Sequence, residues 1–347
     1  MKILYITFVD FDSLTSGSSV RPKKLYDAFI KMGHEVKLLT GLQNRKIERW
    51  KNCYKFFKDI KKEKYDLCYI EPPAGPIFNF CDHLLMLYIA KIKKIPMGIF
   101  YRDAYWKFAE WNDVGNKLKT LVIKYMHIFD LQIIKATCSK VYFPSKMMAD
   151  LFEIKGKDTL PPGCEDIKVI KDENISGIQL VYVGGMNEQY GGQLLLESLE
   201  KVNFKKRVNL HLVCRKDDIK YLEKYKDKEW LTVYHASGEE LINIYAKGNV
   251  AIIPRKIDLY MNFAMPIKLL EYVTFEMPII STNCTEVASF INSNNIGLVC
   301  EDNVESIATV LENITEEQLN LYHNNIIKVK KNNTWEKRVD KILELNT

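Results

Sequence analysis

The chain has 347 residues, of which 47% are hydrophobic and 12% aromatic, a composition that excludes intrinsic disorder and predicts two folded domains. No apolar run approaches the roughly 20 residues of a membrane span, and the eight cysteines form no C-x-x-C pair, which indicates reduced thiols in a cytoplasmic protein. The net charge of +6 is uneven: residues 1–170 hold 29 Lys and Arg against 19 Asp and Glu (+10), and the remainder holds 21 against 25 (−4).

The first half of the chain alternates predicted strands and helices. Residues 2–9, KILYITFV, predict a first buried strand of a sheet covered on both faces, and not a signal peptide. The helix KKLYDAFIKMG, ended by Gly33, and the strand HEVKLLTG complete a βαβ unit. This alternation predicts an open parallel α/β sheet. Further strands are expected at residues 65–71, 96–103 and 140–145, with helices around 84–94 and 118–135.

A second alternating pattern follows the turn-rich segment TLPPGCED at residues 159–166. The strand IQLVYVGG ends in two glycines, and strands are then expected at VNLHLVC, LTVYHA, NVAIIP, MPIISTN and GLVC. Helices are expected near residues 193–202, 221, 239–246 and 287. We therefore predict an α/β protein with two Rossmann-like domains, residues 1–168 and 169–328. Residues 329–347 would form an amphipathic helix, TWEKRVDKILEL, that packs back on the first domain.

The segment FAMPIKLLEYVTFEMPIIST, residues 263–282, carries the strongest chemical signal. A helix that begins near Pro266, which has no N–H to lose, would offer free N–H groups and its dipole to an anion. Lys268 and Glu271 are three residues apart and so share one side of that helix. Lys268 would meet a phosphate and Glu271 a pair of hydroxyls, which suits a nucleoside diphosphate. The alternative is that both are solvated helix residues.

Two tandem Rossmann-like domains with P-x-K-x-x-E-Y late in the second resemble the GT-B fold retaining glycosyltransferases of family 4 (group 1). The Gly/Ser loop at residues 16–19, PPG at 161–163, VYVGG at 181–185, SGEELINIYAKGNVAIIP and TWEKRVDKIL agree with this family along almost the whole chain. The resemblance implies two Rossmann-like domains with a cleft between them, a C-terminal crossover helix, and a nucleotide sugar held by the second domain.

The donor site departs from the family pattern. The family often has a glutamate eight positions before the one matched by Glu271, and here that position is Phe263, so backbone groups of residues 263–265 would replace its sugar contact. The basic residues that the family usually carries after the first strand of the second domain are missing from GGMNEQYGG. The implied donor-binding residues are Gly17, Ser18, Gly184, Gly185, Arg215, Arg255, Phe263, Ala264, Met265, Pro266, Ile267, Lys268 and Glu271, with phosphate charge met by the two arginines or the lysine. Gly184 and Gly185 could instead only end a strand tightly, and the loop around Gly17 could be a surface turn.

Polar residues of the first domain supply the other candidates. Asp103 ends the strand PMGIFYRD and is, with Lys268, a predicted catalytic residue, since some relatives place a histidine or aspartate near here against the donor sugar or acceptor. Arg102 could instead pair with Asp103. Arg21 is either a second phosphate contact or a solvated residue at a helix start. His127 lies in an apolar helical run and has no predicted role.

Two further patterns bear on metals and membranes. Asp10 and Asp12 form a D-x-D, which binds a divalent cation in the other glycosyltransferase fold; here turn and cap roles are favoured, and no metal or cofactor is expected. The basic segment NRKIERWKNCYKFFKDIKKEKY contains Trp50, Phe56 and Phe57. It predicts either a face for an anionic membrane or a helix that packs its aromatic rings inward. No nucleic-acid motif accompanies this charge.

These features predict a retaining, metal-independent hexosyltransferase that moves a sugar from a nucleoside diphosphate, with UDP favoured, to a glycan or lipid-linked acceptor in cell-surface polysaccharide synthesis. The protein would be cytoplasmic, with a peripheral place on the inner face of the membrane. Two alternatives stay open: a non-catalytic nucleotide-sugar-binding partner subunit, and a nucleotide-sugar 2-epimerase, against which the missing glutamate at Phe263 counts. A dehydrogenase is disfavoured because no first-strand loop has G-x-G-x-x-G.

Overall fold

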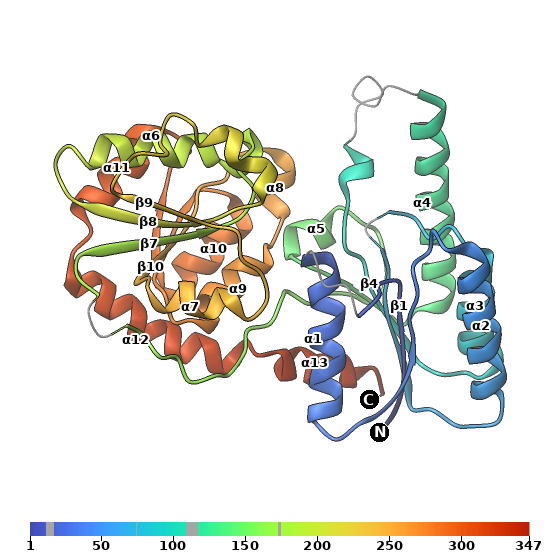
Figure 1. The fold of residues 1–347 in the computed structure, drawn as a ribbon. Helices are drawn as coiled ribbons and strands as arrows, with labels where there is room; N and C mark the ends of the chain where they lie inside the picture. Colours follow the sequence, from blue (N-terminus) through green and yellow to red (C-terminus); the bar gives the residue numbers. More distant parts are fainter. Residues whose placement is uncertain (12–16, 74, 109–116, 173–174, 347) are drawn as a thin grey trace. The chain divides into compact units, whose positions relative to one another are not determined.

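A computed structural model describes residues 1–11, 17–73, 75–108, 117–172 and 175–346, and the chain divides into two compact units (Figure 1). Unit 1 comprises Met1–Pro162 together with Trp335–Thr347, and unit 2 comprises Gly163–Thr334. Each unit contains one six-stranded sheet whose strands are all parallel. The predicted α/β class with two Rossmann-like sheets is confirmed.

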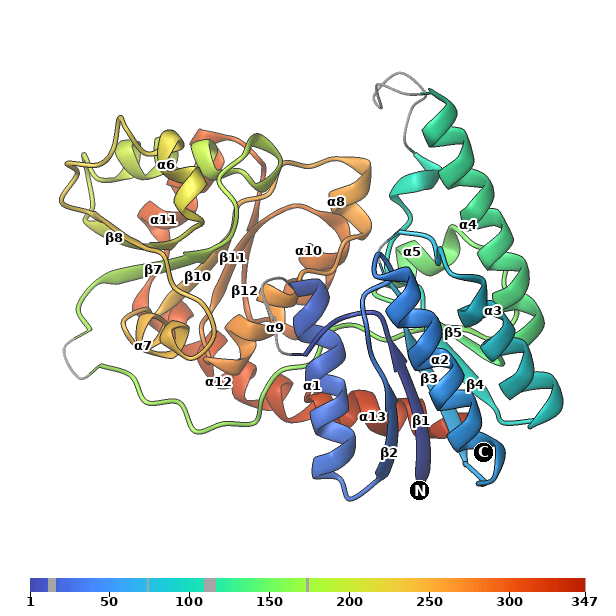
Figure 2. The ribbon, with the colours of Figure 1, turned by 45° about the vertical axis from the view of Figure 1, so that its right-hand side comes forward.

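Unit 1 is a sheet in the order β2-β1-β3-β4-β5-β6 with helices on both faces. Figures 1 and 2 show α1 and α13 on one face of it, and α2, α3 and α4 on the other. The central strands are buried on both faces, which is why they are almost continuously apolar. The elements are β1 (Lys2–Thr7), α1 (Gly17–Lys31), β2 (Glu35–Leu39), α2 (Lys46–Lys61), β3 (Leu67–Glu71), α3 (Phe80–Leu87), the π turn η1 (Tyr88–Ile92), β4 (Met97–Phe100), the 3-10 turn η2 (Tyr105–Lys107), α4 (Lys117–Thr137), β5 (Lys140–Phe143), α5 (Lys146–Asp150), β6 (Lys157–Thr159) and α13 (Trp335–Leu343).

Unit 2 has the sheet order β12-β11-β10-β7-β8-β9 and a hydrophobic core on each face. One core includes residues of α6 and α11, and the other includes residues of α7, α9, α10 and α12. The elements are β7 (Ile178–Val183), η3 (Glu188–Tyr190), α6 (Gly192–Val202), β8 (Val208–Val213), η4 (Lys216–Tyr221), β9 (Leu231–Tyr234), α7 (Glu240–Ala246), β10 (Val250–Ile253), α8 (Leu259–Phe263), α9 (Ile267–Thr274), β11 (Ile279–Thr282), α10 (Thr285–Asn294), β12 (Gly297–Cys300), α11 (Val304–Asn313) and α12 (Glu316–Asn332), and the short turn η5 (Glu344–Asn346) follows α13 in unit 1.

The strand order of each sheet reverses once, and open parallel sheets bind ligands outside the carboxyl ends of the strands at such a point. In unit 1 the order reverses between β1 and β3, which end at Thr7 and Glu71. In unit 2 it reverses between β7 and β10, which end at Val183 and Ile253. These two edges are therefore where ligand-binding side chains are expected.

The C-terminal helix α13 belongs to unit 1, as the predicted crossover helix requires. Trp335, Val339 and Ile342 are buried in the same core as residues of β1 and α1. Arg338 Nε donates to the carbonyl oxygens of Pro161 and Pro162, both at 3.1 Å. The outgoing and returning segments also meet beside this point, within unit 2, where the Cys164 N–H donates to the Asn333 carbonyl at 2.8 Å and Cys164 pairs with Thr334.

Among the described residues, no helix combines the length and the apolar character that crossing a membrane would need.

Candidate functional site

The structure brings three predicted donor-binding residues to one edge of the unit 2 sheet. Gly184 and Gly185 follow β7, and Arg255 follows the neighbouring strand β10. The Arg255 guanidinium lies 5.7 Å from the ring centroid of Tyr190, which comes from the loop after β7. Two glycines and a cation therefore share the point where the strand order reverses.

Close backbone contacts hold this edge in shape. A Cβ atom on Gly184 would lie 2.6 Å from the Tyr182 hydroxyl, which itself donates to the Gly185 carbonyl at 2.6 Å. Gly191 has a φ of 71°, and a Cβ there would lie 1.7 Å from the Pro254 carbonyl oxygen. Only glycine allows so close an approach, so the loop after β7 is pressed against the end of β10.

The predicted helix of P-x-K-x-x-E-Y is α9, with Pro266 as its N-cap and Ile267 as its first residue. Lys268 and Glu271 share one side of it: Lys268 Nζ lies 2.6 Å from Glu271 Oε2. The Tyr245 hydroxyl of α7 donates to the same oxygen at 2.9 Å. Burial, and then the charge of Glu271, raise the pKa of Tyr245 well above its usual value, so this hydroxyl stays a donor at neutral pH.

Helix α9 is also fixed to the sheet edge. The Val183 N–H, the last of β7, donates to the Tyr272 hydroxyl at 3.1 Å. Tyr272 is the residue after Glu271, so this bond joins the P-x-K-x-x-E-Y helix to the strand that leads into Gly184. Burial raises the pKa of Tyr272, which keeps its hydroxyl protonated. Sequence reasoning missed Tyr245 and Tyr272 as supports, although Tyr272 is the last letter of the motif.

Phe263, at the position where the family often has a glutamate, is a core residue. It ends α8, is 2% exposed, and its ring meets that of Tyr260 edge-on with centroids 5.2 Å apart. A side chain so buried offers no polar contact, whereas Ala264 and Met265 after it are partly exposed. Ligand contacts from the backbone of residues 263–265 stay a prediction.

The remaining predicted donor residues are Arg215, Gly17 and Ser18. Arg215 is exposed where β8 ends, and its side chain makes no ion pair or hydrogen bond with the described residues. Gly17 and Ser18 begin α1, but their side chains lie outside the described part of the chain, as do Ser16 of the Gly/Ser loop and Asp12 of the D-x-D.

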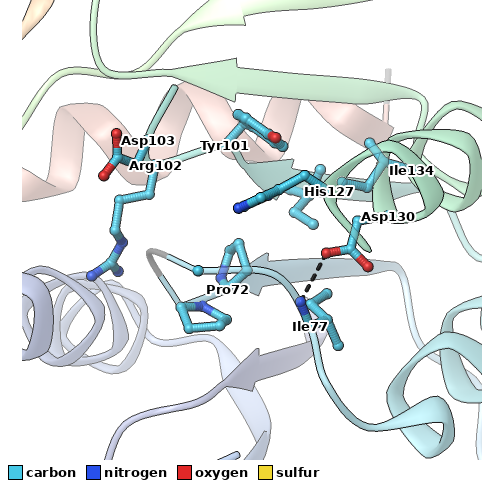
Figure 3. A pocket seen from close by; sticks show the side chains of 11 residues that line it. Pro72, Ile77, Tyr101, Arg102, Asp103, His127, Asp130 and Ile134 are labelled. Atoms are coloured by element: carbon cyan, nitrogen blue, oxygen red, sulfur yellow. Dashed lines mark hydrogen bonds between the residues drawn. The ribbon is translucent and has the colours of Figure 1, made fainter. Parts of the chain in front are cut away.

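In unit 1 the predicted catalytic residue Asp103 lines a pocket beyond the end of β4 (Figure 3). The pocket itself is small, with a volume of about 20 Å³, and reaches about 320 Å³ only when the open space at its mouth is included. The Asp103 carboxylate accepts the Tyr105 N–H at 2.8 Å, and burial raises the pKa of Asp103 above its usual value. The lining residues are Pro72, Pro73, Gly75, Ile77, Ile99, Tyr101, Arg102, Asp103, His127, Asp130 and Ile134.

Two polar residues of α4, His127 and Asp130, line the same pocket and were not predicted. They are three apart on one helix and therefore share a face. The His127 ring stacks on Trp106, with centroids 4.9 Å apart and planes within 7°, and burial lowers the pKa of His127 to about 4. Asp130 accepts the Ile77 N–H at 2.8 Å and lies 2.7 Å from His83 Nε2. His127 is thus a neutral hydrogen-bonding group at pH 7.

Arg102 and Arg21 meet at Glu71, the last residue of β3. Glu71 accepts from Arg21 Nε at 3.0 Å, from the Tyr69 hydroxyl at 2.7 Å and from Arg102 Nη2 at 3.3 Å. Arg102 and Asp103 point in different directions from their shared backbone (Figure 3). The alternative that Arg21 is a solvated residue is wrong, because only 3% of Arg21 is exposed. A charged residue that ends a buried strand, as Glu71 does, was the available sequence signal.

Comparisons with known proteins bear on the fold of the chain and on the family to which unit 2 is similar. Residues 177–317 match the family of glycosyl transferases group 1. No curated protein sequence matches the chain. Among solved structures, a glycosyltransferase from Rickettsia africae ESF-5 is similar at 14% identity, covering 99% of this chain and 97% of that one, with a TM-score of 0.65. WaaG, a glycosyltransferase involved in lipopolysaccharide biosynthesis, is 14% identical over 99% of both chains with a TM-score of 0.66. Anabaena HepE in complex with UDP is 11% identical over 99% of both, with a TM-score of 0.64.

Two parallel six-stranded sheets, with a last helix that returns to the first unit, make this chain a member of the GT-B fold class. Within that class, residues 177–317 match the family of glycosyl transferases group 1, and this match lies in unit 2 and spans Gly184, Arg255 and α9. The resemblance on which the sequence prediction rested is confirmed.

Proposed function

We propose that this protein transfers a hexose from a nucleoside diphosphate sugar, with UDP as the favoured nucleotide, to a glycan or lipid-linked acceptor in cell-surface polysaccharide synthesis. The observation that carries the proposal is the edge of unit 2 where Gly184, Arg255 and the Lys268–Glu271 pair of α9 are fixed to the ends of β7 and β10. Two similar structures support it: HepE is in complex with UDP, and WaaG takes part in lipopolysaccharide biosynthesis.

Binding of the donor would separate Lys268 from Glu271 and give each of the two side chains a partner on the donor. Lys268 and Glu271 have 32% and 27% of their side chains exposed, and such a helix pair is worth only about 0.3–0.5 kcal/mol. Separating them therefore costs little. Lys268, with the free N–H groups of the first turn of α9 and with Arg255, would neutralise the diphosphate, and Glu271 would accept hydrogen bonds from the ribose hydroxyls.

The proposed chemistry is retaining and requires no metal. The bond from the anomeric carbon to the leaving phosphate oxygen breaks, and the acceptor oxygen attacks the same face of the sugar. The acceptor proton passes to the leaving phosphate, so no nucleophile of the protein takes part. Stabilising negative charge on the leaving diphosphate then falls to Lys268 and the α9 N–H groups.

Unit 1 would hold the acceptor at the open mouth of the pocket of Figure 3. The Asp103 carboxylate can accept a hydrogen bond from an acceptor hydroxyl. Neutral His127 can donate or accept there without adding charge. The apolar remainder of the wall, including Pro72, Tyr101 and Ile134, suits the carbon face of a sugar ring.

A membrane-bound acceptor fits the surface of unit 1. In the basic segment, Trp50 is 48% exposed, whereas Phe56 is buried and Phe57 packs on Tyr88 with ring centroids 4.6 Å apart. A further apolar surface lies on α3 and α4. The rings of Phe80 and Phe129 pack edge to face there with centroids 6.0 Å apart, and the two residues are 66% and 43% exposed. Together with the +10 charge of residues 1–170, this surface favours peripheral binding on the inner face of the membrane.

An assay of the purified chain with UDP-sugars tests the proposal. Release of UDP only when an acceptor glycan is present, with the anomeric configuration kept in the product by NMR, is the expected result. UDP release without any acceptor would point to the 2-epimerase alternative, and absence of binding to every nucleoside diphosphate sugar in a thermal-shift screen would reject the donor site. Activity that EDTA abolishes and Mn²⁺ restores would overturn the metal-independent chemistry.

A further inference from the structure

The buried side chain of Arg21 is short of hydrogen-bond partners. Its side chain is 4% exposed, its guanidinium carbon lies 3.7 Å from the ring centroid of Phe100, and its Nε donates to Glu71. The two terminal nitrogens, Nη1 and Nη2, are buried and have no partner among the described residues. A guanidinium carries five N–H donors in a planar fork, and leaving charged donors buried without partners is costly.

Arg21 also shares its carboxylate partner with a second guanidinium. Glu71, which is fully buried, serves both Arg21 and Arg102, whose Nη2 lies 3.3 Å from it. Two tyrosines of the cluster add no negative charge, because burial raises the pKa of Tyr5 and of Tyr69 well above the usual value. Asp103, next along the chain, has its carboxylate bonded to the Tyr105 N–H. Glu71 is therefore shared by two buried guanidinium groups, so Arg21 does not have this carboxylate to itself.

This cluster occupies the edge of unit 1 where its sheet would bind a ligand. Glu71 ends β3, Phe100 ends β4 and Thr7 ends β1, so the cluster lies where the strand order reverses. The Thr7 hydroxyl is a second buried polar group without a partner among the described residues. Arg102 links the cluster to the pocket of Figure 3, which it lines and where its side chain is 13% exposed.

We propose that Arg21 and Arg102 form an oxyanion site in unit 1 that binds a phosphate or carboxylate group of a substrate. The Nη1 and Nη2 atoms of Arg21 present the two-pronged geometry that such a group accepts, and a bound anion would give these two donors a hydrogen-bond partner. This inference rests on the proposed function only for the identity of the ligand, which is either the diphosphate of the donor or an acidic group of the acceptor.

Hydrogen exchange on the full chain, read peptide by peptide with phosphate, pyrophosphate or chloride at equal ionic strength, tests the site. We expect phosphate and pyrophosphate to slow exchange in peptides covering residues 17–31 and 67–71, by about tenfold at ten times Kd. Arg21→Met, which keeps an apolar contact on Phe100, should remove this protection while the variant stays folded in chloride. Lys23→Met, which removes a partly exposed lysine two residues away, should keep it.

The same measurement separates this site from the one in unit 2. Lys268→Ala should lose protection by pyrophosphate over residues 267–274 and keep it over 17–31, so the failure of one site leaves the other visible. Protection of 17–31 by UDP would identify the donor as the source of the anion, and protection by a sugar phosphate or a uronic acid, but not by UDP, would identify the acceptor.

Two results would overturn the proposal. One is equal protection of residues 17–31 in Arg21→Met and the wild type. The other is that none of phosphate, pyrophosphate, UDP, sugar phosphate and uronic acid changes the exchange of these peptides in the wild type relative to chloride. This second result would overturn the proposal even if Arg21→Met does not fold.

Discussion

Lys268 Nζ lies 2.6 Å from Glu271 Oε2, so the two charged residues of the P-x-K-x-x-E-Y helix are each other's partner in this structure. The Tyr245 hydroxyl holds the same carboxylate oxygen from α7. The pair is thus positioned from two sides while about a third of each side chain stays exposed. A pair that is ordered yet easily separated suits a site whose ligand takes over both charges.

Glu271→Ala should weaken UDP binding without unfolding the chain. The lost hydrogen bond to a charged group is worth roughly 1.5–3 kcal/mol, which corresponds to about a 10- to 150-fold rise in Kd. Isothermal titration calorimetry measures it, with the exposed Glu317 of α12 changed to alanine as the matched control. Unchanged affinity for UDP and GDP alike would show that Glu271 does not contact the nucleotide.

Lys268→Ala should cost more affinity for UDP than for uridine, since the proposed partner of this lysine is phosphate charge. The variant also leaves Glu271 with Tyr245 alone, so the double variant with Glu271→Ala is needed to isolate the phosphate contribution. Calorimetry on the wild type, the two single variants and the double variant gives their affinities for UDP and for uridine. Equal losses for UDP and uridine would make Lys268 a structural partner of Glu271 and nothing more.

Acid should destabilise the protein partly through His127. Burial lowers the pKa of His127 to about 4 from 6.5, so the unfolded chain binds the extra proton first, and stability falls as pH drops from about 6.5 to 4. His127→Phe keeps a ring on Trp106 and removes this titration. Its free energy of unfolding should fall less between pH 7 and pH 4.5, by on the order of 1 kcal/mol, in urea titrations. An identical pH dependence in both proteins would mean that His127 is not held neutral by the fold.

Breaking the buried ion pair of Arg49 and Asp82 should lower the free energy of unfolding far more than breaking an exposed ion pair. Arg49 is fully buried, lies 2.7 Å from Asp82 through Nη2, and donates to the Thr7 carbonyl at 2.8 Å. Asp82→Asn leaves a buried guanidinium without its counterion and should cost about 3–5 kcal/mol. Asp27→Asn breaks the exposed pair with Lys23 and should cost under about 1 kcal/mol. Similar decreases in the free energy of unfolding for Asp82→Asn and Asp27→Asn, measured in urea titrations, would contradict this prediction.

The apolar surface of α3 and α4 should bind anionic vesicles. Each lysine or arginine near such a membrane contributes about 1 kcal/mol within a Debye length. Sedimentation with phosphatidylglycerol vesicles at low salt should recover the protein in the pellet, and Phe80→Ser with Phe129→Ser should reduce this. Phe204→Ser, which removes an aromatic ring that is 85% exposed in unit 2, is the control.

Two results would argue for a soluble acceptor. One is equal recovery in the supernatant with anionic and neutral vesicles. The other is binding that the α3 and α4 substitutions leave unchanged.

The sequence was informative where a local pattern determines the structure. Every predicted strand has a counterpart, and α9 begins at Ile267 after Pro266 with Lys268 and Glu271 on one side, because period and helix-start chemistry are local. Local patterns failed for short or polar elements: β6 has three residues, too few for a strand period, and the helix expected near Tyr221 is the 3-10 turn η4.

What the sequence could not supply are the partners that folding brings from afar. Glu271 meets Tyr245, 26 residues earlier, and Glu71 meets Arg21, 50 residues earlier. Nor does an aromatic residue in a basic helix show which way it points: Phe56 is buried and Trp50 is half exposed. Such facts depend on tertiary packing, which no window of a few residues contains.

The return of α13 to unit 1 has a consequence for synthesis on the ribosome. Trp335, Val339 and Ile342 complete the core that surrounds β1 and α1, yet they are made after all of unit 2. At about 5–20 residues per second, the nascent unit 1 waits many seconds with part of its apolar core uncovered, whereas unit 2 is continuous in sequence. Unit 2 can therefore reach its final form first, and the first-made half of the protein is the last to be finished.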